Sequence, residues 1–119
     1  TPMMLARFTQ IDYDREMALI AVVEEDDTEV EVGVTRYTIN PDGTSCEFAL
    51  VVADGWQRQG IGHRLMGRLI DAARQKDLEL MEGDVLTSNQ EMLALARTLG
   101  FSIRADPDDP TVRHVEKRL

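Results

Sequence analysis

The chain has 119 residues, 43% of them hydrophobic and 29% charged, which is enough apolar material for one globular domain with a single core. Its 22 acidic side chains outnumber its 13 lysines and arginines, and the net charge of −9 argues against partners such as nucleic acid or anionic membranes, which need a basic surface. No apolar run approaches the roughly 20 residues of a membrane span, no secretion signal is visible, and a single cysteine fits a reducing compartment, so we expect a cytoplasmic protein.

The first half of the chain predicts three strands after a short N-terminal element. Residues Met3 to Phe8 are compatible with a helix, and residues 11–15 with a polar connection. Ala18 to Val23 is a compact apolar run rich in β-branched side chains, which predicts a buried strand. Glu29 to Asn40 alternates, so its three valines are expected to share one face; they are Val30, Val32 and Val34. Pro41-Asp42-Gly43 predicts a turn, and the strand that follows it, Ser45 to Val52, completes an antiparallel meander.

From residue 61 the apolar period becomes helical. Ile61, Leu65, Leu69 and Ala72 recur at helical spacing and predict a helix that runs to Gln75. A strand from Leu78 to Leu86 follows, and then a second amphipathic helix that begins after Asn89 and ends at Gly100. Residues 101–104 and 111–117 are expected to form a final hairpin. This order of elements predicts an α+β (mixed α/β) fold.

One segment combines glycines with an unusual charge. Between Gln57 and Lys76 there are five cations and one anion, a net charge of +4, whereas the rest of the chain carries −13. The loop before the predicted helix ends on two glycines, and the free N–H groups of a helix N-terminus attract anions. A Walker loop needs Lys and then Ser or Thr after Gly60, and a Rossmann loop needs a glycine in place of Leu65, so neither pattern fits.

Within this loop, Gln57-Arg58-Gln59-Gly60-Ile61-Gly62 fits the pattern Gln/Arg-x-x-Gly-x-Gly. It resembles the loop that binds the pyrophosphate of acyl-CoA in the GCN5-related N-acetyltransferases, the GNAT family. The helix from Asn89 to Leu99, followed by Gly100-Phe101, matches the family as well, and the resemblance covers roughly residues 18–117. It implies the GNAT fold, a mostly antiparallel central sheet with flanking helices, and an N-acetyltransferase that uses acetyl-CoA and no metal.

A closer resemblance lies near the N-terminus. Arg7 to Glu16, followed by Met17 to Val22, looks like the GNAT domain of bacterial Pat-type protein lysine acetyltransferases, which is fused behind an acyl-CoA-synthetase-like region. This implies that residues 1–119 are one GNAT domain excised from a longer protein, with the N-terminal part of the fold short or missing. The first residue, Thr1, agrees with this interpretation.

The same resemblance implies direct transfer of an acetyl group to a lysine ε-amine of a protein, for example a metabolic enzyme such as an acyl-CoA synthetase. Two alternatives stay open. One is a small-molecule amine N-acetyltransferase, because the fold and loop are the same for both. The other is a non-catalytic regulatory domain that senses acyl-CoA.

The GNAT resemblance also implies the residues that bind the donor. The backbone of Leu50 and Val52 would hold the pantetheine arm, and the amides of the loop would cradle the pyrophosphate; the loop residues are Gln57, Arg58, Gln59, Gly60, Ile61 and Gly62. Asn89 would contact the donor from the second helix, although helix capping alone also explains it. Arg58 and Arg64 either reach CoA phosphates or are ordinary solvated arginines.

Glu47 is the candidate general base. Removing a proton from a lysine with a pKa of about 10.4 costs about 4–5 kcal/mol at pH 7, so a carboxylate beside the thioester would help. The alternative is a glutamate that simply faces solvent. Many relatives have a tyrosine as general acid after the leucine of the second helix; here Ala96 follows Leu95, so we expect water or unassisted departure of the thiolate.

The other reactive side chains are expected to have structural roles. Cys46 precedes Glu47 in a predicted strand, and neighbouring strand residues point to opposite faces, so the two are not expected to share a site. His63 and His114 lack the spacing of metal ligands. Trp56 is expected to pack against the loop.

Overall fold

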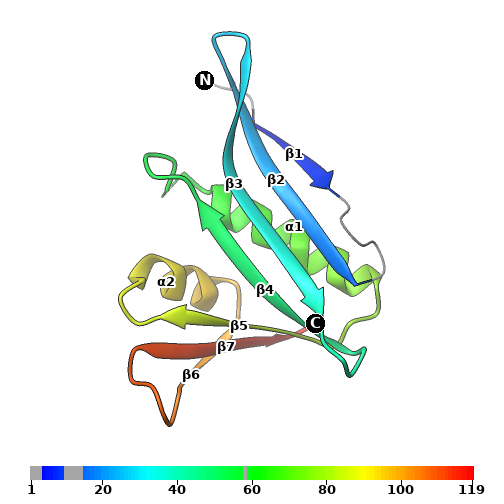
Figure 1. Cartoon of the computed structure of the whole chain (residues 1–119), viewed down its shortest axis with the longest axis vertical. Helices are drawn as coiled ribbons and strands as arrows, with labels where there is room; N and C mark the ends of the chain where they lie inside the picture. The colour runs from blue at the N-terminus through cyan, green and yellow to red at the C-terminus, as the bar shows by residue number, and fades with distance from the viewer. Residues whose placement is uncertain (1–3, 10–14, 58) are drawn as a thin grey trace.

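The computed structural model describes residues 4–9, 15–57 and 59–119. These residues form seven strands and two helices (Figure 1). In chain order they are β1 (Met4–Thr9), β2 (Glu16–Glu25), β3 (Thr28–Ile39), β4 (Ser45–Val52), α1 (Ile61–Gln75), β5 (Leu80–Leu86), α2 (Gln90–Thr98), β6 (Ser102–Ala105) and β7 (Val112–Arg118).

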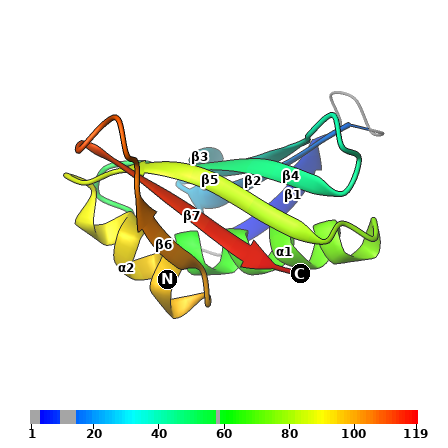
Figure 2. The ribbon, with the colours of Figure 1, turned by 90° about the horizontal axis from the view of Figure 1, so that it is seen from below.

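The strands form one mixed sheet in the order β1-β2-β3-β4-β5-β7-β6. Every neighbouring pair is antiparallel except β4 and β5, which are parallel. Both helices lie on the same side of this sheet, which we call the helix face (Figure 2). No helix of the described residues covers the other side, which we call the open face (Figure 2).

The core lies between the sheet and the helix face. Leu65, Met66 and Leu69 of α1 are completely buried against the sheet, because its apolar side chains recur on one side of the helix. Gly33 lets α1 approach closely, since a Cβ there would stand 3.0 Å from the Leu65 Cδ1 atom. Neither helix of the described residues is long or apolar enough to cross a lipid bilayer.

The parallel pair β4 and β5 separates soon after it forms. Their ladder covers only three residues of each strand, 45–47 and 80–82, and the strands then diverge toward their C-terminal ends (Figure 1). The Phe48 ring packs on Phe101, with the ring centres 5.3 Å apart, and it lies so close to Gly83 that a Cβ there would stand 2.7 Å from its Cε1 atom. Gly83 therefore makes room for an aromatic ring at the point where the strands part.

The predicted N-terminal helix is wrong. Residues 4–9 form the edge strand β1, which pairs with β2 from Met4 opposite Val23 to Thr9 opposite Ala18. Pairing with the neighbouring strand decides the conformation of this short segment, and local propensity does not. Of the predicted connection over residues 11–15, only Arg15 lies within the described residues.

The predicted alternation in β3 is also wrong in one respect. Val32 is 1% exposed, but Val34 lies on the opposite face with 37% of its surface exposed. The register between β2 and β3 shifts between Ala21 and Val22, where Val32 is an extra residue without an opposite partner. Such a bulge reverses the alternation, so the buried positions that follow are Thr35 and Tyr37. The other strands, the turn and both helices are confirmed, with ends shifted by one or two residues.

Candidate active site

The loop between β4 and α1 presents backbone N–H groups to an anion. Gly55 and Gly60 have positive φ angles of 84° and 79°, which glycine adopts without strain. Gly60 precedes the first helical residue, and no side chain caps this end of α1 or places an acid in its first turn. The first N–H groups of the helix are therefore available, and the helix dipole favours negative charge beside them.

The glutamines of the loop hold its shape. The Gln57 side-chain amide donates to the Val52 carbonyl at 3.3 Å, and the Gln59 side-chain amide donates to the Gly55 carbonyl at 3.2 Å. Trp56, which was predicted to pack against the loop, is half-buried and packs against the core. Arg58, which was predicted to bind the donor, lies outside the described residues.

A cavity of about 340 Å³, which we call the donor cavity, lies between the end of β4, the start of α1 and α2. It brings together six of the predicted donor residues: Leu50, Val52, Gln57, Gly60, Gly62 and Asn89. Gly62 is tightly placed, since a Cβ there would stand 3.1 Å from Leu95 Cδ2 and 3.4 Å from Leu50 Cδ2. Of the remaining predictions, Ile61 is buried in the core and Gln59 is exposed beside the cavity rather than in its lining.

The backbone of β4 also faces the opening between β4 and β5, which begins where their ladder ends. The Ala53 N–H group donates to the Val32 carbonyl at 2.8 Å, so the odd-numbered residues of β4 direct their backbone groups toward β3. In an antiparallel ladder the residues between them direct theirs to the other side. The N–H and C=O groups of Leu50 and Val52 therefore point toward β5, beyond Glu47, where the ladder between β4 and β5 ends.

The second helix contributes apolar lining and one cap. The Asn89 side chain accepts a hydrogen bond from the Met92 N–H group at 3.1 Å, so it caps α2 and also lines the donor cavity. Leu95 lines this cavity, whereas Ala96, at the place of the family tyrosine, is completely buried in the core. Sequence analysis missed His63, Glu91, Met92 and Ala94 as further lining residues. The helical period of α2 alone does not say which of its faces meets the cavity.

The open face carries a row of carboxylates beside the same opening. Glu47 is exposed, and it lies opposite Glu82 of β5, which in turn lies opposite Glu116 of β7. These three glutamates, which we call the acidic row, line a second cavity of about 250 Å³ together with Asp84, Arg104 and His114. Sequence analysis missed Glu82 and Glu116. The sequence signal that could have placed Glu82 on the open face is the alternation of polar and nonpolar residues in β5: Glu82 stands between Met81 and Gly83, which the structure shows to be buried.

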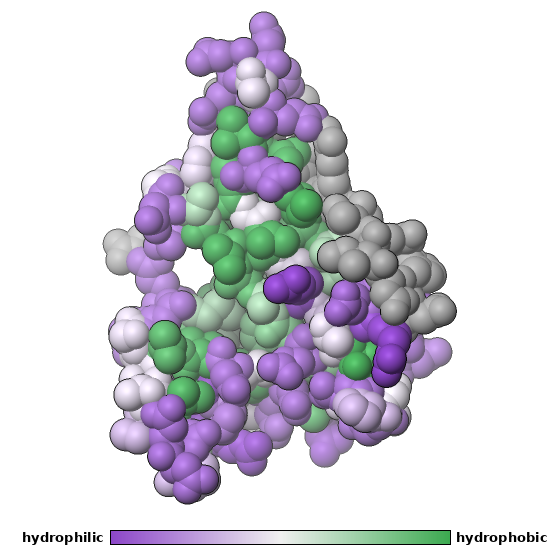
Figure 3. All heavy atoms as spheres, viewed as in Figure 1, coloured by the Kyte–Doolittle hydropathy of each residue, from purple (hydrophilic) through white to green (hydrophobic). Residues whose placement is uncertain are grey.

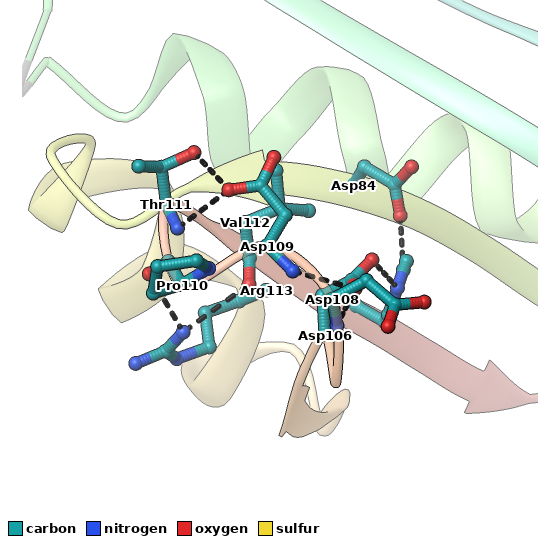
Figure 4. A network of polar contacts seen from close by, with 9 residues as sticks. Asp84, Asp106, Asp108, Asp109, Pro110, Thr111, Val112 and Arg113 are labelled. Carbon is teal, nitrogen blue, oxygen red and sulfur yellow. Dashed lines mark hydrogen bonds and ion pairs between the residues drawn. The ribbon is translucent and has the colours of Figure 1, made fainter.

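His114 closes one side of this second cavity. Its Nδ1 atom forms a hydrogen bond with the Asp84 carboxylate, and its Nε2 atom lies 2.8 Å from a carboxylate oxygen of Asp106; Figure 4 shows both contacts as dashed lines. The hydrogen bonds that Asp84 and then Asp106 accept from the protonated imidazole raise the pKa of His114 above its ordinary value. The N–H groups of Asp108 and Asp109 donate to Asp106, and its pKa is lowered by the Asp108 bond first and by His114 second.

The remaining reactive groups behave as structural residues. Cys46 is completely buried, and burial, with a smaller effect of Glu82, raises the pKa of its thiol to about 12. It is therefore not a thiolate nucleophile at neutral pH. In the part of the chain that the structure describes, no group of three or more His, Cys, Asp or Glu side chains is placed to hold a metal ion.

Similar proteins were found by sequence and by structure. Acetyltransferase PA5475 of Pseudomonas aeruginosa is 38% identical over 111 residues, which are 93% of this chain and 60% of that protein. The GNAT domain of S. lividans PAT superposes with a TM-score of 0.77 at 22% identity, and the match covers 95% of this chain and 66% of that one. A domain from Methanocaldococcus jannaschii superposes with a TM-score of 0.79 at 13% identity over the full length of both chains.

The two solved structures share the fold, and the chain spans about three fifths of the length of PA5475. The sequence model described as "Acetyltransferase (GNAT) family" matches residues 2–101, which is most of the chain. The predicted fold is thereby confirmed, and the chain belongs to the GNAT family of acetyltransferases.

Proposed function

We propose that this domain transfers the acetyl group of acetyl-CoA directly to a lysine ε-amine of a cytoplasmic protein, with Glu47 as general base. Acetyl-CoA is the donor of the GNAT family. The observation that carries the proposal is the construction of β4. This strand lines the donor cavity with Leu50 and Val52, and it places Glu47 on the other face where its ladder with β5 ends.

The start of α1 and the backbone of β4 support acyl-CoA as the ligand of the donor cavity. The N–H groups at the start of α1 would hold the pyrophosphate, and the backbone of Leu50 and Val52 would pair with the pantetheine amides as a strand does. Helix α1 carries Arg64, Arg68 and Arg74 against one acid, Asp71, which favours a polyanion. The missing side chain of Gly62 lets Leu50 and Leu95, two lining residues of the donor cavity, pack closely against the start of α1.

The acidic row supports an amine acceptor. Like charges directly opposite one another in a sheet are destabilising, and among the described residues none of these three glutamates forms an ion pair. A cationic acceptor would relieve this repulsion. A protonated amine that enters the second cavity would be held beside Glu47 by the same charges.

Glu47 would then remove the proton that prevents the amine from reacting. Acetyl-CoA supplies an acyl group activated as a thioester. Glu47 takes the first proton from the ammonium group. Transfer then forms a bond between the neutral amine nitrogen and the acetyl carbon and breaks the carbon–sulfur bond, while the nitrogen loses its second proton and the departing thiolate gains one by relay through water, which leaves the amide and the CoA thiol. The Val52 N–H group would donate to the thioester oxygen as negative charge develops there.

The choice of a protein lysine is supported by the resemblance of the N-terminal segment to Pat-type domains and by the shared fold with the S. lividans PAT domain. It is also consistent with the open face, which no helix of the described residues covers and which a large acceptor can therefore approach (Figure 2).

The test is an acetylation assay with acetyl-CoA, read by mass spectrometry, in which lysine-containing proteins and peptides compete with polyamines. We expect mono-acetylated lysine in the peptide and a rise in melting temperature when acetyl-CoA is added. Acetylation of polyamines alone would indicate a small-molecule acetyltransferase. Binding of acetyl-CoA without acetylation of any amine would indicate a regulatory sensor.

A further inference from the structure

Two large hydrophobic side chains stand in solvent at the mouth of the opening. Val51 is 63% exposed and Leu86 is 58% exposed, more than any other large hydrophobic side chain of the described residues. Val51 lies near the end of β4 and Leu86 at the end of β5. Exposed apolar side chains beside a functional cavity commonly mark a contact with a partner.

Both side chains belong to the open face, and both are in register with the acidic row. Glu47 and Glu82 are opposite each other in the parallel ladder. Val51 and Leu86 each follow their glutamate by four residues, and because side chains alternate along a strand, each lies on the same face as that glutamate. At roughly 3.3 Å per strand residue, the apolar pair lies about 13 Å from the carboxylates, one side chain on each strand that borders the opening.

The apolar surface continues onto the neighbouring strands. Val51 lies opposite Val34 of β3, which lies opposite Ile20 of β2, so three apolar side chains form one row across the open face. Figure 3 shows the open face with apolar side chains gathered over its central strands and hydrophilic ones below them, toward β5 to β7. The open face therefore has an apolar region over its central strands and an acidic region over β5 and β7, and the two regions meet at the opening.

We propose that Val51 and Leu86 select the acceptor: they contact a hydrophobic side chain that lies about four residues from the acetylated lysine in an extended segment of the partner protein. This inference rests on the proposed function. The partner is then a protein segment with one cationic group, which contacts the acidic row, and one apolar group, which contacts Val51 and Leu86. A free polyamine satisfies the first requirement and not the second.

The test uses two lysine peptides of equal length and charge. One carries leucine four residues before and after the lysine, and the other carries serine at both places; spermidine is a third acceptor without an apolar group. We expect kcat/KM for the leucine peptide to exceed that for the serine peptide by about fivefold to tenfold. In V51T and in L86Q, this ratio of kcat/KM values is expected to fall to about one, because the KM for the leucine peptide rises while kcat stays the same.

The matched control is V30T, because Val30 is also a partly exposed valine of β3 but lies near the hairpin between β2 and β3. It is expected to keep the full preference. If the wild-type domain acetylates both peptides equally, or if the two variants lower kcat/KM equally for all three acceptors, this inference is wrong while the proposed function stands. If neither peptide is acetylated, the proposed function fails and the inference fails with it.

Discussion

The two sides of the opening between β4 and β5 are built from the same strand but present different chemical groups. On the helix face, β4 contributes backbone groups and the apolar side chains of Leu50 and Val52 to a cavity completed by glycines. On the open face, it contributes the carboxylate of Glu47 and the exposed side chain of Val51. One side is defined by main-chain geometry and the other by side-chain identity. Since alternate residues of a strand face opposite ways, each side can change without the other.

The charge of the chain follows the same division. The segment from Gln57 to Lys76 carries +4 and forms the start of the donor cavity and helix α1, whereas the rest carries −13. The acidic row is part of that remainder and lies on the opposite face. In the proposed function, a polyanionic donor and a cationic acceptor would be drawn to different faces and would meet where the ladder between β4 and β5 ends.

The largest effect is expected from E47Q. The amide keeps the size of the side chain but takes no proton, so kcat at pH 7 is expected to fall by roughly 10²–10⁴-fold. Because Glu47 lies outside the donor cavity, the Kd for acetyl-CoA is expected to stay within about twofold, as measured by calorimetric titration.

The pH dependence of E47Q tests the reason for the loss. The fraction of deprotonated lysine rises about tenfold per pH unit below its pKa of about 10.4, so the defect is expected to shrink between pH 7 and pH 9. Wild-type turnover in the variant at both pH values would remove Glu47 from the mechanism.

A smaller effect, on the other side of the opening, is expected from G62A. The added methyl group meets Leu95 and Leu50 in the donor cavity, so the KM for acetyl-CoA is expected to rise roughly tenfold while the KM for the acceptor is unchanged. G67A is the matched control, because Gly67 lies in the same helix with nothing within 4 Å of a Cβ.

Alanine favours a helix over glycine by about 0.5–1 kcal/mol, so G67A is expected to be at least as stable as the wild type, whereas in G62A the contact of the methyl group with Leu95 opposes this gain. Equal donor affinity in G62A and G67A would mean that the arm does not pass Gly62. Thermal unfolding of both variants checks the stability.

The acidic row should give a smaller, salt-dependent effect. In E82Q and E116Q, the KM for a lysine peptide is expected to rise about twofold to fivefold at low salt and less at high salt, because exposed charge pairs are weak and screened. E31Q, which removes the same charge from an exposed position of the β2–β3 hairpin, is the control. If E31Q raises the KM as much as E82Q, only the net charge of the domain matters and the row has no special role.

The two sides also differ in how well the sequence predicts them. The donor loop is continuous in the chain, and its glycines and helix start are local features, so the resemblance to the GNAT family predicts residues 57–62 and Asn89 as donor-binding residues from the sequence alone. The acceptor side is assembled from β4, β5 and β7, and it depends on which residues face each other across the sheet. A single sequence contains Glu82 and Glu116 but not the register that brings them to Glu47.

The two errors in the predicted fold have the same origin. The helix expected at residues 3–8 is a strand because β2 offers it an edge, and Val34 is exposed because a bulge in β3 shifts the alternation by one residue. Both depend on pairing between segments rather than on the segment itself. Local patterns predict an element well when the element satisfies its own hydrogen bonds, as α1 and α2 do, and less well when a neighbouring strand satisfies them.

The smallest expected effect concerns stability on the open face and comes from H114Q. The pKa of His114 is raised above its ordinary value of 6.5 by Asp84 and then Asp106, so its protonated form is favoured by folding. This contribution is complete below pH 6.5, and it is lost as the pH rises through the pKa of the folded state. At the acid end, the folded state lowers the pKa of Asp106, so the stability that Asp106 contributes is present above its ordinary pKa of 3.8 and is lost as the pH falls further.

The difference in melting temperature between wild type and H114Q is therefore expected to be largest at about pH 5–6 and to shrink toward pH 9. A difference that is constant from pH 5 to pH 9 would mean that His114 stabilises the hairpin by packing alone, and that the acceptor side holds its shape without this charge.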